Sequence, residues 1–177
     1  REKQARPTIG FLFSEGVFKG VTDSLKVISN LKDKTPNLRV ISFGSHPPNN
    51  MVVPDYIELS ISPKQDEIRL LYQQCDLWLC CSLIEGFGLT VLEAMACRTP
   101  CVSTKCGGPE DIVMENENGF LCEVNDIEAL TERAYKILNF DAAVWQKYSS
   151  QAYQRASSYS WNDATELFEK ALFEANR

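Results

Sequence analysis

The sequence has no long hydrophobic run, a single histidine and no excess of basic residues. None of its 177 residues belongs to an apolar stretch of about 18 residues, so we expect no transmembrane segment. The formal net charge is −6, which argues against a surface for nucleic acid or anionic membranes. His46 precedes two prolines in a polar loop, where nothing would orient it as a general base. A catalytic set of the Ser-His-Asp or Cys-His kind is therefore not expected.

The sequence also lacks the spacing of a metal site. Its seven cysteines include no C-x-x-C pair, and no cluster of acids and histidines has metal-ligand spacing. Cys80, Cys101 and Cys122 lie in short apolar runs, where cysteine behaves as a small hydrophobic residue. We therefore expect buried, reduced thiols in a cytoplasmic protein, with no metal and no cofactor.

Short apolar runs alternate with segments of helical periodicity. This alternation predicts βαβ units and a Rossmann-like, doubly wound, mostly parallel sheet with helices on both faces. No linker is long enough to divide the chain, so residues 1–177 are expected to form a single domain. Strands are expected at residues 8–13, 39–43, 56–59, 76–80, 100–103 and 120–124, and helices at residues 21–31, 63–74, 88–97, 127–138, 142–157 and 162–175.

The chain is organised around residues 85–93, Glu-Gly-Phe-Gly-Leu-Thr-Val-Leu-Glu, which predict a glycine turn that opens a helix. Gly86 and Gly88 allow positive φ and a close approach of the backbone to a ligand. The amides from Gly88 to Val91 would be unpaired donors at the positive end of the helix dipole. A helix start of this kind binds phosphate readily.

A second acid, Glu93, follows in the same helix. Its neighbours are apolar on nearly every side, which predicts a buried helix. An unpaired buried carboxylate is unfavourable. A ligand with paired hydroxyls, such as ribose, would give Glu93 a partner.

Several other loops follow strands and should meet at the same edge of the sheet. In a doubly wound sheet, ligands bind outside the carboxyl ends of the strands near the point where the winding reverses. We expect residues 14–20, 44–45, 61–62 and 104–109 to converge there on one crevice. Lys19 would place a positive charge opposite the phosphate-binding helix start. Gly107-Gly108 is either a turn that brings backbone to a ligand or an ordinary connection.

Taken together, these residues resemble the retaining glycosyltransferases of the GT4 family, which have the GT-B fold. Residues 85–93 match the E-x7-E signature of that family. The resemblance covers nearly the whole chain and implies the C-terminal, donor-binding half of such an enzyme. Because the chain begins at Arg1 without a methionine, we expect the N-terminal acceptor half to be missing. The other matching residues are Lys19-Gly20, 72–76, Ser82, 92–96, Thr99-Pro100, Gly107-Gly108, 118–121 and the segment around Trp161.

The resemblance implies two catalytic residues, Glu85 and Lys19. Glu85 would hold a hydroxyl of the donor sugar, and Lys19 would neutralise the diphosphate leaving group. Members of the family work without a catalytic metal, so that cationic side chains and the helix end stabilise the developing charge.

The resemblance also implies how the donor is bound. The amides of the glycine turn would line the sugar, and the first amides of the helix would meet the diphosphate. The second acid would bind the ribose hydroxyls, and the loops after the second and third strands would contact the base. The residues expected to bind the donor are Gly86, Phe87, Gly88, Leu89, Thr90, Glu93, Gly44 and Ile61.

The expected function is transfer of a sugar, with retained anomeric configuration, from a nucleoside diphosphate to an acceptor glycan or glycolipid. This would serve glycan or polysaccharide biosynthesis, and the isolated half is expected to be inactive alone. The full-length protein would be free in the cytoplasm or peripheral to the membrane.

Two departures from the family pattern stand out. The family usually has an arginine five or six residues before the lysine, where this chain has Ser14 and Phe13, and Glu15 adds a negative charge nearby. Arg98 stands where the family often has glycine, a residue that commonly takes the left-handed cap of a helix.

Two other functions fit parts of the pattern. The missing arginine is compatible with a binding or regulatory module that takes a nucleotide sugar without turnover. A dinucleotide-dependent oxidoreductase fits less well, because Val91 stands where the third glycine of G-x-G-x-x-G belongs. The turn also lies several βα units into the chain, where that fingerprint is expected in the first unit.

Overall fold

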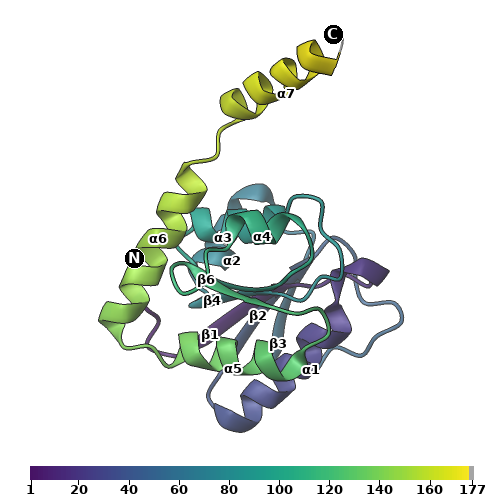
Figure 1. Ribbon diagram of the computed structural model, residues 1–177. Helices are drawn as coiled ribbons and strands as arrows, with labels where there is room; N and C mark the ends of the chain where they lie inside the picture. Colours follow the sequence, from purple (N-terminus) through teal and green to yellow (C-terminus); the bar gives the residue numbers. More distant parts are fainter. Residues whose placement is uncertain (176–177) are drawn as a thin grey trace.

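The computed structural model describes residues 1–175, in which a six-stranded sheet lies between two layers of helices (Figure 1). The strand order is β3-β2-β1-β4-β5-β6, and every pairing is parallel. The predicted doubly wound α/β fold is thus confirmed. The strands are β1 (Thr8–Leu12), β2 (Arg39–Gly44), β3 (Ile57–Ile61), β4 (Leu77–Cys80), β5 (Cys101–Thr104) and β6 (Gly119–Cys122). The helices are η1 (Val17–Lys19), α1 (Val21–Lys34), α2 (Gln65–Gln73), α3 (Leu89–Ala96), α4 (Gly108–Ile112), α5 (Ile127–Leu138), α6 (Ala142–Ser157) and α7 (Trp161–Ala175).

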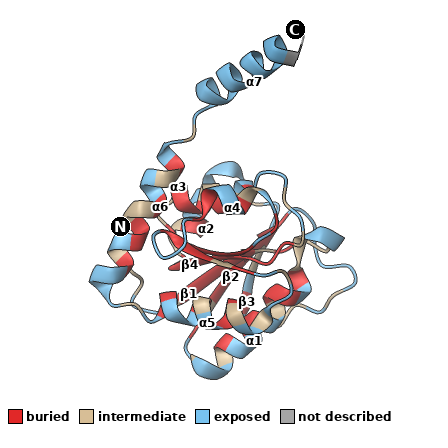
Figure 2. Ribbon diagram, viewed as in Figure 1, coloured by how far each residue is buried: buried red, intermediate tan, exposed pale blue. Residues whose placement is uncertain are grey.

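Apart from the edge strand β3, the sheet is buried on both faces, as Figure 2 shows. Successive side chains of a strand point to opposite faces, so that β4 supplies two separate cores. Leu77 and Leu79 belong to the core shared with α1 and α5, whereas Trp78 and Cys80 belong to the core shared with α2 and α3. Because β4 is buried on both faces, its sequence is a continuous apolar run. The seven cysteines are free; six are buried and Cys97 is partly buried, as expected.

The winding of the chain reverses between β1 and β4. From β1 the chain moves outward through β2 to β3, then returns to the other side of β1 and continues through β4 and β5 to β6. The loops that leave the carboxyl ends of β1 and β4 therefore start from adjacent strands and serve opposite halves of the sheet. Loops at such a point form the usual ligand crevice of an open α/β sheet.

The expectation that α3 is buried on nearly every side was wrong. Val91, Ala94 and Met95 are buried, but Leu89 is 56% exposed and Ala96 is also exposed. The helix packs against β4, β5, α2 and α6, which accounts for its apolar residues on several sides. Its first residue nevertheless reaches the surface.

The end of α3 has the left-handed backbone that the family pattern suggested. Arg98 has a φ of 65°, a conformation that glycine adopts with the least strain. The guanidinium carbon of Arg98 lies 4.2 Å from the centre of the Tyr153 ring, and Ser149 Oγ donates to the Arg98 carbonyl at 2.8 Å. These contacts join the end of α3 to α6.

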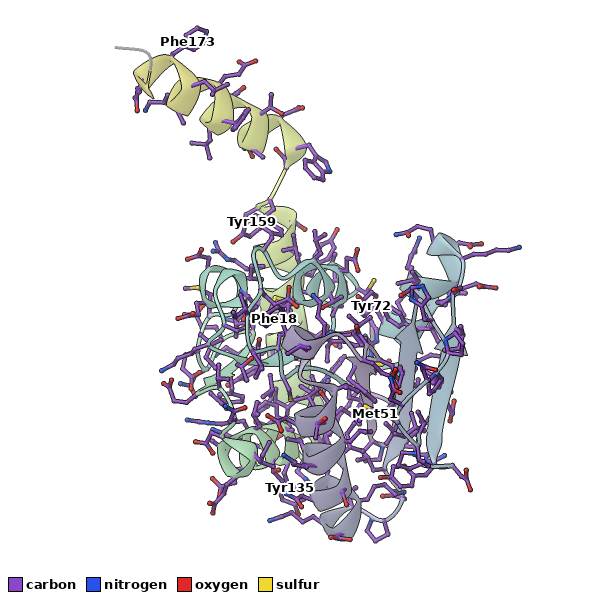
Figure 3. All side chains as sticks on the ribbon, turned by 90° about the vertical axis from the view of Figure 1, so that its right-hand side faces the viewer. Phe18, Met51, Tyr72, Tyr135, Tyr159 and Phe173 are labelled. Carbon is purple, nitrogen blue, oxygen red and sulfur yellow. The ribbon has the colours of Figure 1, made fainter. Side chains whose placement is uncertain are left out.

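The last helix, α7, extends away from the rest of the molecule. Figure 3, which is turned by 90° from Figure 1, shows the same separation, with Phe173 beyond Tyr159. Trp161 is 85% exposed and Phe173 is 73% exposed. The apolar side chains of α7 therefore add little to the buried core of the domain.

This arrangement predicts that a chain ending at Tyr159 keeps its thermal stability. We expect the Tm to change by less than about 2 °C, because truncation removes little buried apolar surface. A chain ending at Asn139, which also lacks α6 and the fully buried Trp145, should lose stability severely. Differential scanning calorimetry measures both. A loss of more than about 8 °C for the shorter truncation would mean that α7 packs on the domain in solution.

Candidate functional site

The loops that follow β1 and β4 are joined through their backbones. The amide of Leu83 donates to the carbonyl of Phe18 at 2.8 Å. Gly20 has a φ of 62°, and a Cβ at this position would lie 1.8 Å from the carbonyl oxygen of Cys81. Only glycine can occupy such a contact. The contact places Lys19, the preceding residue, beside the loop that carries Glu85.

A third loop, which follows β5, supports Glu85 from the other side. The Glu85 amide donates to the Cys106 carbonyl at 2.7 Å, and the Gly108 amide donates to the Glu85 carbonyl at 3.0 Å. A Cβ on Gly107 would lie 2.4 Å from the same Glu85 carbonyl. The glycine pair therefore lets one loop approach another, and it holds residues 85–87 in place.

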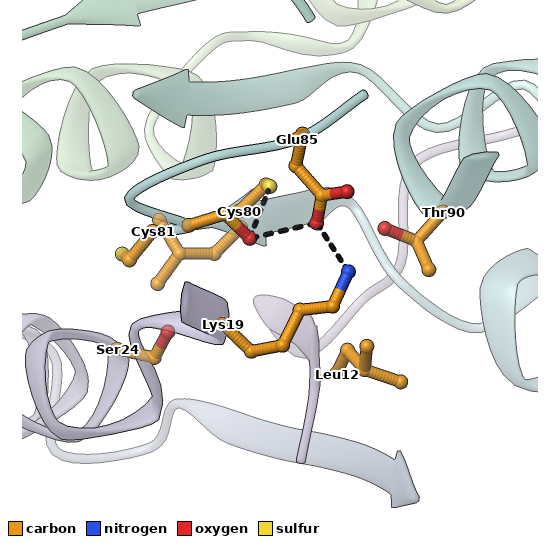
Figure 4. A pocket seen from close by; sticks show the side chains of 9 residues that line it. Leu12, Lys19, Ser24, Cys80, Cys81, Glu85 and Thr90 are labelled. Atoms are coloured by element: carbon orange, nitrogen blue, oxygen red, sulfur yellow. Dashed lines mark hydrogen bonds and ion pairs between the residues drawn. The ribbon is translucent and has the colours of Figure 1, made fainter. Parts of the chain in front are cut away.

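The three loops bring Lys19 and Glu85 into direct contact (Figure 4). Lys19 Nζ donates to Glu85 Oε1 at 2.7 Å, and Ser82 Oγ donates to the same oxygen at 2.9 Å. The Glu85 side chain is 12% exposed and the Lys19 side chain 38% exposed. The cavity that these residues line together with Thr90 has a volume of about 10 Å³, room for about one water molecule.

The start of α3 has the features of an anion-binding helix end. Gly88 caps the helix with a φ of 85°, and its carbonyl accepts the amides of Val91 and Leu92. The expectation that the Val91 amide is unpaired was therefore wrong, because the first turn closes on Gly88. Leu89 and Thr90, the first two helical residues, have amides with no carbonyl one turn earlier in the helix.

Gly86 differs from what the sequence predicted. Positive φ occurs at Gly88 but not at Gly86, because the turn needs the left-handed conformation only at the residue that caps the helix. A Cβ on Gly86 would meet no atom within 4 Å. The packing of the chain itself thus does not require glycine at position 86. Phe87, between the two glycines, has a 46% exposed ring that packs edge-to-face on Tyr159.

Glu93 has a partner within the chain. The side chain is partly buried, and Tyr72 donates its hydroxyl to Glu93 Oε2 at 2.9 Å. Burial, with the adjacent Glu93 carboxylate, raises the pKa of Tyr72, so that the phenol keeps its proton and stays a donor. Glu93 does not line the cavity that Lys19 and Glu85 share.

Gly44 and Ile61 lie together on the other side of β1. They pair in register at the ends of β2 and β3, and the Ser62 amide donates to the Gly44 carbonyl at 2.7 Å. A Cβ on Gly44 would lie 2.4 Å from the Phe13 carbonyl oxygen, which again requires glycine. These two residues share the carboxyl edge of the sheet with Glu85, without lining its cavity.

A separate hollow lies beside them, and it contains the residues that replace the family arginine. It is lined by Phe13, Ser14, Glu15 and His46, among others. Glu15 Oε1 accepts the amides of Asn49 and Asn50 at 3.1 and 2.8 Å, so that this carboxylate holds the β2–β3 loop. The expectation that four loops form one crevice was wrong: residues 14–16 and Ser45 line this hollow, Lys19 lines the cavity of Glu85, and residues 61–62 and 104–109 line neither.

Sequence reasoning assigned no role to Ser82 or to Tyr72. Ser82 lies two residues past β4 and three residues before Glu85, a position that could have suggested a contact. The Tyr72–Glu93 bond joins α2 to α3, and no spacing in the sequence predicts it. In the described part of the chain, no group of three or more acidic, cysteine or histidine residues could hold a metal ion. None of the helices within residues 1–175 is both long and apolar enough to cross a membrane.

Comparison with known proteins identifies the family. Residues 8–155 match the family model of the glycosyl transferases group 1. The chain belongs to the group 1 glycosyltransferases. One curated relative is the N-acetyl-alpha-D-glucosaminyl L-malate synthase of Bacillus anthracis, 41% identical over 75 residues, which are 42% of this chain and 20% of the relative. This chain spans less than half the length of such relatives.

Solved structures of glycosyltransferases share the fold. The C-terminal domain of a group 1 glycosyltransferase from Francisella tularensis superposes with a TM-score of 0.74 at 22% identity, over 88% of this chain and 87% of that domain. Anabaena HepE, solved in complex with UDP-glucose, superposes with a TM-score of 0.78 at 20% identity, over 96% of this chain and 49% of its own. The resemblance to the C-terminal domain of a GT4 enzyme with the GT-B fold is thereby confirmed.

The two glycines of the turn should respond differently to alanine. We expect Gly88→Ala to lower the free energy of unfolding by roughly 1–2 kcal/mol, because φ is positive and the new Cβ crowds Pro109. Gly86→Ala should change it by less than about 0.5 kcal/mol, because the position is open. Urea unfolding followed by circular dichroism measures both. Equal losses in the two variants would contradict the backbone described for the turn.

Proposed function

We propose that this chain is the donor-binding half of a retaining glycosyltransferase. The enzyme would take a sugar from a nucleoside-diphosphate sugar and transfer it to an acceptor glycan or glycolipid in glycan or polysaccharide biosynthesis. The observation that carries the proposal is the Lys19–Glu85 pair beside the start of α3, at the point where the winding of the sheet reverses. The UDP-glucose complex of Anabaena HepE, which shares the fold, supports a nucleotide-sugar donor.

The cationic side of this site would hold the diphosphate. Lys19 and the amides of Leu89 and Thr90 would contact the phosphate oxygens, as a charged side chain and a helix start do in other phosphate sites. These groups would stabilise the leaving diphosphate without a metal. Glu85 would accept a hydroxyl of the sugar, with the amides of Gly86 and Phe87 alongside.

The nucleoside would lie toward α2 and the other half of the sheet. Glu93, held by Tyr72, would accept the ribose hydroxyls, and the loops beyond Gly44 and Ile61 would contact the base. A carboxylate with one oxygen already bonded to a phenol keeps its other oxygen as an acceptor, which suits a pair of hydroxyls.

Donor binding would separate Lys19 from Glu85. A cavity of about 10 Å³ cannot admit a diphosphate, so Lys19 would turn from the carboxylate toward the phosphates. The Lys19 side chain is 38% exposed and can turn, and a diphosphate has more negative charge than one carboxylate. The pair therefore keeps the lysine near the site without preventing its release.

A second function, a nucleotide-sugar-binding module without turnover, is favoured by one observation. No arginine precedes Lys19 in the loop after β1. Lys105, a basic residue of the loop after β5 that could replace it, donates to Glu123 at 2.5 Å on the surface. One cation of the family site is therefore without a substitute in this arrangement. Such a module would bind the donor in the full-length protein and transfer nothing across a panel of acceptors.

A thermal-shift panel with UDP-, GDP-, ADP- and dTDP-sugars tests the proposal. A ligand that binds only the folded state raises the Tm by mass action, and we expect this for at least one sugar nucleotide. Lys19→Met should then weaken its binding by roughly 10- to 100-fold, through loss of a charge-assisted contact. Lys32→Met is the matched control, because Lys32 donates to the carbonyls of Pro36 and Leu38 at the opposite edge of the sheet.

Three results would count against the proposal. A flat panel would contradict donor binding, and equal losses for Lys19→Met and Lys32→Met would contradict the assigned site. Binding without any release of nucleoside diphosphate by the full-length protein, in the presence of acceptors, would favour the module that binds without turnover.

A further inference from the structure

The Glu85 carboxylate is held through only one of its oxygens. Lys19 Nζ and Ser82 Oγ both donate to Oε1, at 2.7 and 2.9 Å. Among residues 1–175, no donor is assigned to Oε2. Because a carboxylate is planar, two donors on one oxygen hold the direction of the other. Oε2 is thus left available to a ligand hydroxyl.

Ser82 is itself held firmly. It is 3% exposed, and Thr104 Oγ1 donates to its carbonyl. Cys80 Sγ donates to Ser82 Oγ at 3.6 Å. A hydroxyl has one hydrogen to donate. An ionised carboxylate only accepts hydrogen bonds, so the hydrogen of the Ser82–Glu85 bond comes from the Ser82 hydroxyl.

Lys19 and Ser82, which both donate hydrogen bonds to Glu85, would separate when a sugar nucleotide binds. Lys19 is a flexible side chain, 38% exposed, and under the proposed function it turns toward the diphosphate. Ser82 is short and buried, and it cannot follow. Ser82 would then be the side chain of this chain that still orients Glu85.

We propose that Ser82 is a positioning residue that holds Glu85 so that its free oxygen, Oε2, accepts a hydroxyl of the donor sugar. The inference rests on the proposed function, and it adds a specific consequence. Ser82 acts on the sugar and not on the nucleoside diphosphate, so its loss should affect binding of the sugar nucleotide alone.

The experiment uses isothermal titration calorimetry to compare the binding of each nucleoside diphosphate with the binding of a corresponding sugar nucleotide. The pairs are UDP and UDP-glucose, GDP and GDP-mannose, ADP and ADP-glucose, and dTDP and dTDP-glucose. For the pair that binds, Ser82→Ala should lower the affinity for the sugar nucleotide roughly tenfold, through loss of a hydrogen bond to a charged group. Binding of the diphosphate should stay within about twofold. Ser82→Thr, which keeps a hydroxyl, should restore most of the loss.

Ser42→Ala is the matched control. Ser42 is also fully buried, and its hydroxyl donates to the Phe11 carbonyl within the sheet, so this variant should bind both members of the pair normally. Should Ser82→Ala fail to fold, Cys80→Ala removes the thiol that contacts the Ser82 hydroxyl. This variant should lower the affinity for the sugar nucleotide by roughly two- to threefold and leave the affinity for the diphosphate unchanged.

The outcomes separate the inference from the proposed function. If the diphosphate binds but Ser82→Ala weakens both members of a pair equally, or neither, Ser82 does not position Glu85 and the proposed function stands. Equal affinities of the wild-type chain for the diphosphate and for the corresponding sugar nucleotide would also overturn the inference. If the wild-type chain binds none of the eight compounds, the proposed function fails, and the inference fails with it.

Discussion

The contact of Gly20 with the Cys81 carbonyl determines the geometry of the site. It joins the loops that leave two adjacent strands, at the point where the sheet reverses its winding. No side chain is involved at this contact, so the distance between the loops is set by the backbone alone. Lys19 and Ser82 are the residues next to the contact, one on each loop. The fold therefore fixes the backbone positions from which Lys19 and Ser82 reach Glu85.

The site combines groups of opposite charge that support each other in the free protein. Lys19 and Glu85 form a pair, and Tyr72 bonds to Glu93, so that neither acid is buried without a partner. Among the described residues, no hydrogen-bond donor reaches the second carboxylate oxygen of either acid. Under the proposed function, a nucleoside-diphosphate sugar would offer the complementary set, namely an anion for the lysine and the helix start, and hydroxyls for the two carboxylates.

The fold could be predicted from the sequence because local patterns determine it. The bounds of α5 and α6 match the expected ranges, since Asp126 and Asp141 accept the amides of Ala129 and Val144 as helix caps. The roles of single residues in the site were harder to predict. Gly86 was expected to have positive φ, but the turn needs it only at Gly88. The exposed start of α3, the Tyr72–Glu93 bond and the Ser82–Glu85 bond depend on tertiary packing, which spacing along the chain does not show.

The central claim is that the start of α3 and Lys19 form one anion site. The most direct test is a titration of the ¹⁵N-labelled chain with UDP, GDP, ADP and dTDP, followed through the backbone amides. For the nucleotide that binds, the account predicts the largest changes at Gly88, Leu89 and Thr90, with smaller changes at Lys19 and Glu85. Changes confined to the opposite edge of the sheet or to α7, or no change with any nucleotide, would contradict it.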